Sequence, residues 1–112
     1  MEECNIVVLC GRVSSEPRSR ELPSGSTLVQ VEVTTRTEAA TATVPVVWFD
    51  PPAEVIAGTD VVVVGQVRRR FFRAGGVTQS RTEVVAHRIV PATRRRQVQR
   101  EVARALGSLT VH

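Results

Sequence analysis

Hydrophobic and polar residues alternate over several short stretches of this 112-residue chain, a pattern that predicts half-buried β-strands. The alternation is clearest at Leu28–Thr35, where the valines point to one face and the residues between them to the other. Apolar runs at Asn5–Val13 and Thr43–Phe49 predict two further strands. Gly11 indicates a bulge or a bend in the first of these, and Pro45 an edge or a bulge in the second, because proline cannot donate to a β-ladder.

Residues 61–90 contain the strongest strand signal, a pair of β-rich runs that predicts a hairpin. Val61–Arg73 begins with four valines, and Val77–Val90 returns after the turn sequence Ala74-Gly75-Gly76. The polar segments Ser14–Ser26 and Arg36–Ala42 are predicted to be connections between the earlier strands.

Two helices are predicted outside the strands. A short one is expected at Asp50–Gly58, where Asp50 suits the N-cap, Pro51 the first helical position and Gly58 the C-terminal stop. A second is expected at Thr93–Leu106, because apolar residues recur every four positions on one side and arginines on the other. We expect this helix to pack on its own barrel or against a second copy rather than to contact nucleic acid, because helices gain most of their stability by burying an apolar face.

The order of these elements predicts an all-β fold. Five strands, with a short helix between the third and the fourth, suit a five-stranded OB-type barrel followed by a C-terminal helix. A small β-sandwich is the alternative with the same strand content. We expect residues 1–92 to form the barrel domain and residues 93–112 to form an amphipathic, arginine-rich helix and tail.

Charge is unevenly distributed along the chain. The formal net charge is +4, and all 15 basic residues are arginine. Residues 1–67 contain four arginines and nine acidic residues, whereas residues 68–112 contain eleven arginines and two acidic residues. The arginine-rich half predicts a polyanionic partner such as nucleic acid. GC-rich coding is an alternative source of arginine, but the clustering of the residue favours a partner.

The sequence offers little that points to a metal, a cofactor or catalysis. Cys4 and Cys10 are the only cysteines; on one strand they would lie about 20 Å apart, which excludes a disulfide if that strand forms. Cys10 is expected to be a buried small hydrophobe, and His87 a structural or solvent-facing residue. Without a catalytic triad, a carboxylate pair or a phosphate loop, we expect no enzyme, no cofactor and no small-molecule substrate. The acidic start and the absence of a long apolar stretch predict a cytoplasmic protein with no membrane contact.

Cations and aromatic rings share one face of the predicted hairpin. By the two-residue period of a strand, Arg68, Arg70 and Phe72 point the same way. Arginines pair with phosphates and rings stack on exposed bases, so this face is a candidate surface for single-stranded nucleic acid. Arg69 and Arg73 point the other way and are expected to be solubilising charges or protection of a strand edge.

Three segments resemble the bacterial single-stranded DNA-binding protein family. They are NIVVLCGRVSSEPRSRELPSG, VVWFDPPAEVIAG and the hairpin GQVRRRFF…GG…TEVVA, which together run from about Asn5 to Val90. The resemblance implies an OB fold that binds single-stranded DNA without sequence preference, usually as a homotetramer. It also implies phosphate contacts from Arg20, Arg68 and Arg70, and base stacking by Phe49 and Phe72.

Expectations for three further residues complete this candidate surface and its surroundings. Arg36 and Arg81 are expected to be outlying cations of the same surface. Trp48 neighbours Phe49 on a strand and must face the opposite way, so it is expected in the core or in an interface. The family's tryptophan at the start of the third strand is Thr43 here, a second one in the loop before it has no counterpart, and the family's glycine-rich linker and acidic tip are missing. We therefore expect weaker and more salt-sensitive binding, typical of an accessory paralogue.

The leading interpretation is a non-catalytic protein of the nucleoid that binds single-stranded DNA in replication, recombination or repair, as a homotetramer or a dimer. A first alternative is an OB-fold module for protein interactions, which would use the apolar stripe of the C-terminal helix. A second alternative is binding of single-stranded RNA by the same groove, because stacking and phosphate contacts serve both nucleic acids.

Overall fold

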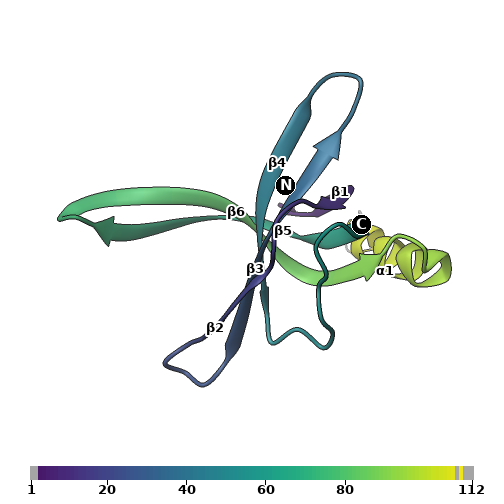
Figure 1. Ribbon diagram of the computed structural model, residues 1–112. Helices are drawn as coiled ribbons and strands as arrows, with labels where there is room; N and C mark the ends of the chain where they lie inside the picture. Colours follow the sequence, from purple (N-terminus) through teal and green to yellow (C-terminus); the bar gives the residue numbers. More distant parts are fainter. Residues whose placement is uncertain (1–2, 108, 110–112) are drawn as a thin grey trace.

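The computed structural model describes residues 3–107 and residue 109, and Figure 1 shows its strands and helix. In chain order these elements are β1 (Val7–Val13), β2 (Arg18–Glu21), β3 (Thr27–Arg36), β4 (Thr41–Phe49), β5 (Asp60–Ala74), β6 (Val77–Pro91) and α1 (Arg95–Gly107). The five predicted strands and the C-terminal helix are therefore present. One additional strand lies in a segment that was predicted to be a loop.

Five of the strands close into a barrel. The sheet runs in the order β1, β5, β6, β4, β3, and a second pairing of β1 with β3 closes it. Neighbouring strands are antiparallel except β4 and β6, which pair in parallel through Val46 with Val84 and Val47 with Val85. A closed five-stranded barrel with this mixed pairing is OB-like. The prediction of an OB-type barrel is confirmed in this respect, and the β-sandwich alternative is wrong.

The barrel interior is filled by alternate residues of the strands. Val29, Val31 and Val33 of β3 are all buried, as their alternation predicted. Trp48 is only 4% exposed and belongs to the same core cluster, so the expectation that it points inward is confirmed. Pro45 tolerates its place in β4 because the pairing with β6 begins one residue later, which leaves one side of the strand free.

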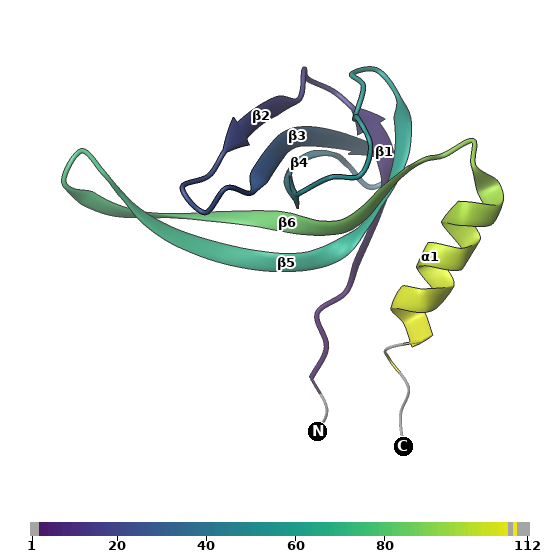
Figure 2. The same ribbon diagram turned by 90° about the horizontal axis from the view of Figure 1, so that it is seen from below.

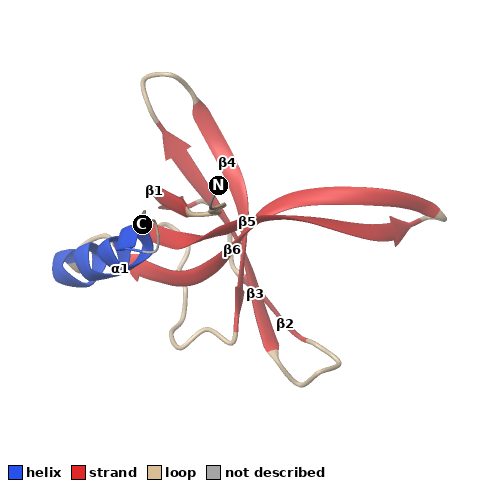
Figure 3. Ribbon diagram, turned by 180° about the vertical axis from the view of Figure 1, so that it is seen from behind, coloured by secondary structure: helices blue, strands red, loops and turns tan. Residues whose placement is uncertain are grey.

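The segment that joins β4 to β5 contains no helix and is drawn as a loop in Figure 3, so the helix predicted at Asp50–Gly58 is wrong. Asp50 has a positive φ of 45°, and its side chain accepts a hydrogen bond from the backbone N–H of Thr27. Asp50 thus caps the end of the β3–β4 ladder instead of a helix. Pro52 also disfavours a helical conformation at Pro51, because a residue before proline is pushed towards extended backbone.

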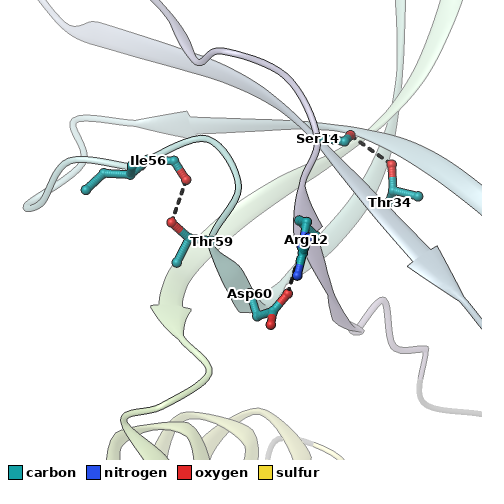
Figure 4. A network of polar contacts seen from close by, with 6 residues as sticks. All are labelled: Arg12, Ser14, Thr34, Ile56, Thr59 and Asp60. Atoms are coloured by element: carbon teal, nitrogen blue, oxygen red, sulfur yellow. Dashed lines mark hydrogen bonds and ion pairs between the residues drawn. The ribbon is translucent and has the colours of Figure 1, made fainter.

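The end of this connection is fixed against β1 (Figure 4). The Thr59 hydroxyl donates to the carbonyl of Ile56, and the N–H of Val13 donates to the carbonyl of Thr59. Arg12 pairs with Asp60 at 3.2 Å, but both side chains are more than 60% exposed, so this ion pair contributes little stability. Backbone hydrogen bonds therefore hold the loop in place.

The predicted loop Ser14–Ser26 contains the short strand β2, in which Arg20 pairs with Leu28 of β3. All four residues of β2 are exposed. A strand that buries no side chain shows no alternation in its sequence, and for this reason the pattern failed to predict it.

Glycine is required where two backbones approach closely. A Cβ on Gly65 would lie 2.1 Å from the Val85 carbonyl oxygen, and one on Gly11 would lie 2.4 Å from that of Thr34. The register runs without a shift through Gly11, and the irregularity between β5 and β6 falls at Val64 and Gly65. The bulge predicted as one option at Gly11 is therefore not found there, and its glycine serves close packing instead.

The β5–β6 hairpin extends well beyond the barrel as an arm, and α1 lies at the opposite end of the molecule (Figures 1 and 2). Gly75 and Gly76 form the turn of the arm with positive φ values of 58° and 79°, which suits the predicted two-glycine hairpin. Helix α1 contacts β5 and β6. Val62 and Val90 point away from the barrel core by register and are nevertheless buried, which indicates that α1 covers them.

Cys10 is exposed, so the expectation that it is a buried hydrophobe is wrong. It lies opposite Val62, on the outer face of the barrel, while Leu9 and Val13 of the same strand pack inward. Cys4 is also exposed, and both cysteines are free thiols.

Asn5 extends the pairing of β1 with β5 by means of its side chain. Its amide donates to the carbonyl of Val67 at 2.6 Å and accepts from the N–H of Val67 at 2.9 Å. Because two hydrogen bonds would be lost at an exposed site, Asn5→Ala is expected to lower the free energy of unfolding by about 1–2 kcal/mol in a urea titration. Cys4→Ala is the neighbouring control, and equal stability of the two variants would contradict this role for Asn5.

Candidate nucleic-acid interface

One outer face of the sheet carries a shallow groove. By strand register, the outward residues of β2, β3, β4, β6 and β5 form a continuous surface that begins at Arg20 and ends at Arg70. The groove has a volume of about 190 Å³. Its lining residues are Arg20, Leu22, Leu28, Gln30, Val47, Phe49, Arg68, Arg70 and Glu83.

A buried carboxylate forms the floor of this groove. Glu83 is 1% exposed, and its Oε2 accepts a hydrogen bond from Arg68 Nε at 2.8 Å and lies 2.7 Å from Nη2 of the same guanidinium. Arg70 lies 3.4 Å from the same oxygen, and Arg81 lies 3.6 Å from Oε1. A buried carboxylate is tolerated only when cations and donors surround it, so Glu83 holds these three arginines together at one point.

The arginines of the groove also stack on aromatic rings. The guanidinium carbon of Arg68 lies 5.4 Å from the centre of the Phe49 ring, and that of Arg70 lies 5.1 Å from the Phe72 ring. Both distances are within the range of cation–π attraction. Each pair presents a planar guanidinium and a ring at the surface, and bases stack on both kinds of group.

Four of the predicted site residues lie together in the groove: Arg20, Phe49, Arg68 and Arg70. Phe72 adjoins them through its contact with Arg70, and Arg81 through Glu83.

Arg36 does not lie in this groove. It lines a separate hollow of about 500 Å³ beside Arg12 and Asp60, at the end of β5 remote from the arm. Arg36 was predicted to begin a loop but is the last residue of β3, and its distance from the other arginines could not be judged from the sequence.

Glu83 is the functional residue that the sequence reasoning did not single out. It is the only acidic residue between Val61 and Val90, and it stands directly opposite Arg68 in the hairpin register. A single carboxylate within an arginine-rich hairpin is a signal that could have identified it.

The described residues contain no group of three or more His, Cys, Asp or Glu side chains that could hold a metal ion. None of the helical structure in residues 3–107 is long and apolar enough to cross a membrane. Three arginines line the groove and Arg81 lies beside it, against one carboxylate, so the site is positively charged, which suits a polyanion.

An OB-like barrel with arginines and aromatic rings on one outer face defines a nucleic-acid-binding OB protein. The chain belongs to the single-strand binding protein family, whose profile matches residues 4–92. Membership of this family implies binding of single-stranded DNA, and the family is not one of enzymes. No curated protein sequence matches the chain.

Solved structures show the same fold. A structure described as the Plasmodium falciparum SSB complex with ssDNA superposes with a TM-score of 0.66 at 18% sequence identity. The match covers 81% of this chain and 96% of the other. At this level of identity the comparison supports the barrel architecture, whereas the family profile supports the class of ligand.

Proposed function

We propose that the protein binds single-stranded DNA without sequence preference on one outer face of residues 1–92. The contacting residues are Arg20, Phe49, Arg68, Arg70 and Phe72, with Arg81 as a cation beside them and Arg36 as a remote cation at the separate hollow. Arginines would replace the counterions of the phosphates while the rings and guanidinium planes stack on bases. Duplex DNA hides its base faces and should bind more weakly.

The pair of arginine–phenylalanine stacks beside Glu83 is the observation that carries this proposal. Both stacks lie on the same face, and the ion pairs with Glu83 hold their arginines in position. Such pre-organised groups lose less conformational entropy when a strand binds. A merely solvated basic surface would not combine three arginines with one buried anion.

Fluorescence anisotropy of a labelled oligo-dT of about 35 nucleotides, compared with a duplex of equal length, tests the proposal, because stacking requires unpaired bases. We expect preferential binding of the single strand at both low and moderate salt. Equal and fully salt-labile binding of the two would overturn the proposal. An oligo-rU of the same length added to the series separates a preference for DNA from one for RNA.

Two sets of variants separate the stacking contribution from the charge contribution. Phe72→Ala is expected to weaken binding by about fivefold to a hundredfold, with an unchanged dependence on salt, because about 1–3 kcal/mol of stacking per base is lost. Arg68→Ala with Arg70→Ala is expected to reduce the slope of log K against log salt by about 1.4, because each phosphate contact to a single strand contributes about 0.7. The same salt slope in both sets would contradict this division of roles.

We also propose that the protein acts as a homotetramer or a dimer in replication, recombination or repair, as its family membership suggests. Residues 93–112 would be accessory to the DNA-binding unit. Light scattering of the purified protein, with and without oligo-dT, measures the mass of the assembly. A monomer under both conditions would contradict the oligomeric part of the proposal.

A further inference from the structure

The arm carries a second arginine–phenylalanine pair on the face opposite to the groove. The guanidinium carbon of Arg69 lies 5.9 Å from the centre of the Phe71 ring, and Arg69 Nε donates to the Ser80 hydroxyl at 3.3 Å. By register this face also carries three hydroxyl residues of β6. We call it the far face of the arm, and its members are Arg69, Phe71, Arg73, Thr78, Ser80 and Thr82, all of them exposed.

The far face is exposed because the arm extends beyond the barrel. Along β5 and β6, Val67 pairs with the core residue Val84, so the far face continues the inward face of the strands beyond the barrel wall. Phe71 is 67% exposed there, more than any other large hydrophobic side chain in the described chain. An aromatic ring in this position buries little apolar surface on its own chain, and a partner that covers it would gain that surface.

Charge identifies the partner. Between Val61 and Thr82 the chain contains five arginines and no acidic residue. A second copy of the arm would bring like charges together, which disfavours pairing of two arms through this face. A polyanion with exposed aromatic surfaces satisfies both the arginines and the ring, and single-stranded nucleic acid has both properties.

We propose that single-stranded nucleic acid passes round the arm and occupies its far face, where bases stack on Phe71 and phosphates contact Arg69 and Arg73. The Ser80 hydroxyl orients Arg69 for this role. This inference rests on the proposed function, because the strand that reaches the far face is the one that leaves the groove. It adds a second stacking site to each chain and makes the arm a two-sided binding element.

The proposal is tested by the length dependence of binding in Phe71→Ala, Phe72→Ala and Ile56→Ala variants of the 112-residue chain. Ile56 is a matched control, since it is 64% exposed and lies beside Ile89 and Pro91, at the end of β6 remote from the arm. Labelled oligo-dT of about 8 and about 30 nucleotides is titrated with each protein, because one OB fold covers up to about 16 nucleotides. A light-activated crosslinker at position 71 and another at position 56 give a second readout.

We expect Phe71→Ala to weaken binding of the long oligonucleotide at least about fivefold and to leave the short one unchanged. Phe72→Ala should weaken both, Ile56→Ala neither, and only the crosslinker at position 71 should capture DNA. If Phe71→Ala binds both lengths as tightly as the wild type and the crosslinker at position 71 captures no DNA, the inference is wrong while the proposed function stands. The same conclusion follows if Phe71→Ala loses an oligomeric assembly but keeps its affinity for DNA. A wild-type protein that binds no single strand would overturn the proposed function as well.

Discussion

Gly65→Ala is expected to lower the free energy of unfolding by about 3 kcal/mol or more, because the added methyl group meets backbone and has nowhere to move. The Cβ would lie 2.1 Å from the Val85 carbonyl oxygen and 2.9 Å from its carbon. Gly65 also sits at the register shift between β5 and β6, within the barrel wall where β5 pairs with β1 on its other side. Urea unfolding followed by far-ultraviolet circular dichroism measures the effect.

Two further glycine substitutions are compared with Gly65→Ala in the same experiment. Gly11→Ala should be similarly destabilising, since its Cβ would lie 2.4 Å from the Thr34 carbonyl oxygen. Gly107→Ala is the control, because a Cβ there meets no atom within 4 Å. If Gly65→Ala unfolds at the same urea concentration as Gly107→Ala, the close approach of the two strands is not required for stability.

Glu83→Gln is expected to change stability and DNA binding in opposite directions. Removing one partner of a fully buried ion pair costs about 3–5 kcal/mol, but the paired arginines here are partly exposed and water can solvate them. A loss of about 2 kcal/mol in the free energy of unfolding is therefore expected, from the charge-assisted hydrogen bond that Arg68 donates to Oε2. The freed arginines should meanwhile bind phosphates more strongly at low salt.

The salt dependence of Glu83→Gln gives the quantitative test. One additional unpaired cation should steepen the slope of log K against log salt by about 0.7 for a single strand. Glu38→Gln is the matched control, since it makes the same charge change at an exposed residue between β3 and β4 that forms no ion pair in the described part of the chain. Weaker binding by Glu83→Gln at low salt would mean that the carboxylate mainly aligns the arginines and does not compete with DNA.

Much of the barrel could be predicted from the sequence because most of its strands bury one face. The valines of β3 and the four-valine start of β5 produce patterns that only buried strands require. The exposed strand β2 gives no such signal. The Asp-Pro-Pro segment after β4 misled the prediction because the residues that cap a helix also build tight turns, and only the pairing of Asp50 with Thr27 decides between them.

The part of the candidate site that lies on a single strand could be predicted from the sequence. The two-residue period placed Arg68, Arg70 and Phe72 on one face, and the register agrees. The resemblance to the family supplied Arg20 and Phe49, which lie far away in sequence and which no local pattern could have joined to the hairpin. Glu83 and the far face of the arm became visible only from cross-strand pairing and from the point where the barrel ends.

The burial of Trp48 gives this protein a convenient internal probe. It is the only tryptophan in the chain and is 4% exposed within the barrel core, on the opposite face of β4 from the neighbouring groove residue Phe49. Its emission should therefore shift to the red when the barrel unfolds and should change little when oligonucleotide is added. A single sample can then report folding through its own fluorescence and binding through a dye on the DNA, so variants that lose affinity are separated from variants that lose structure.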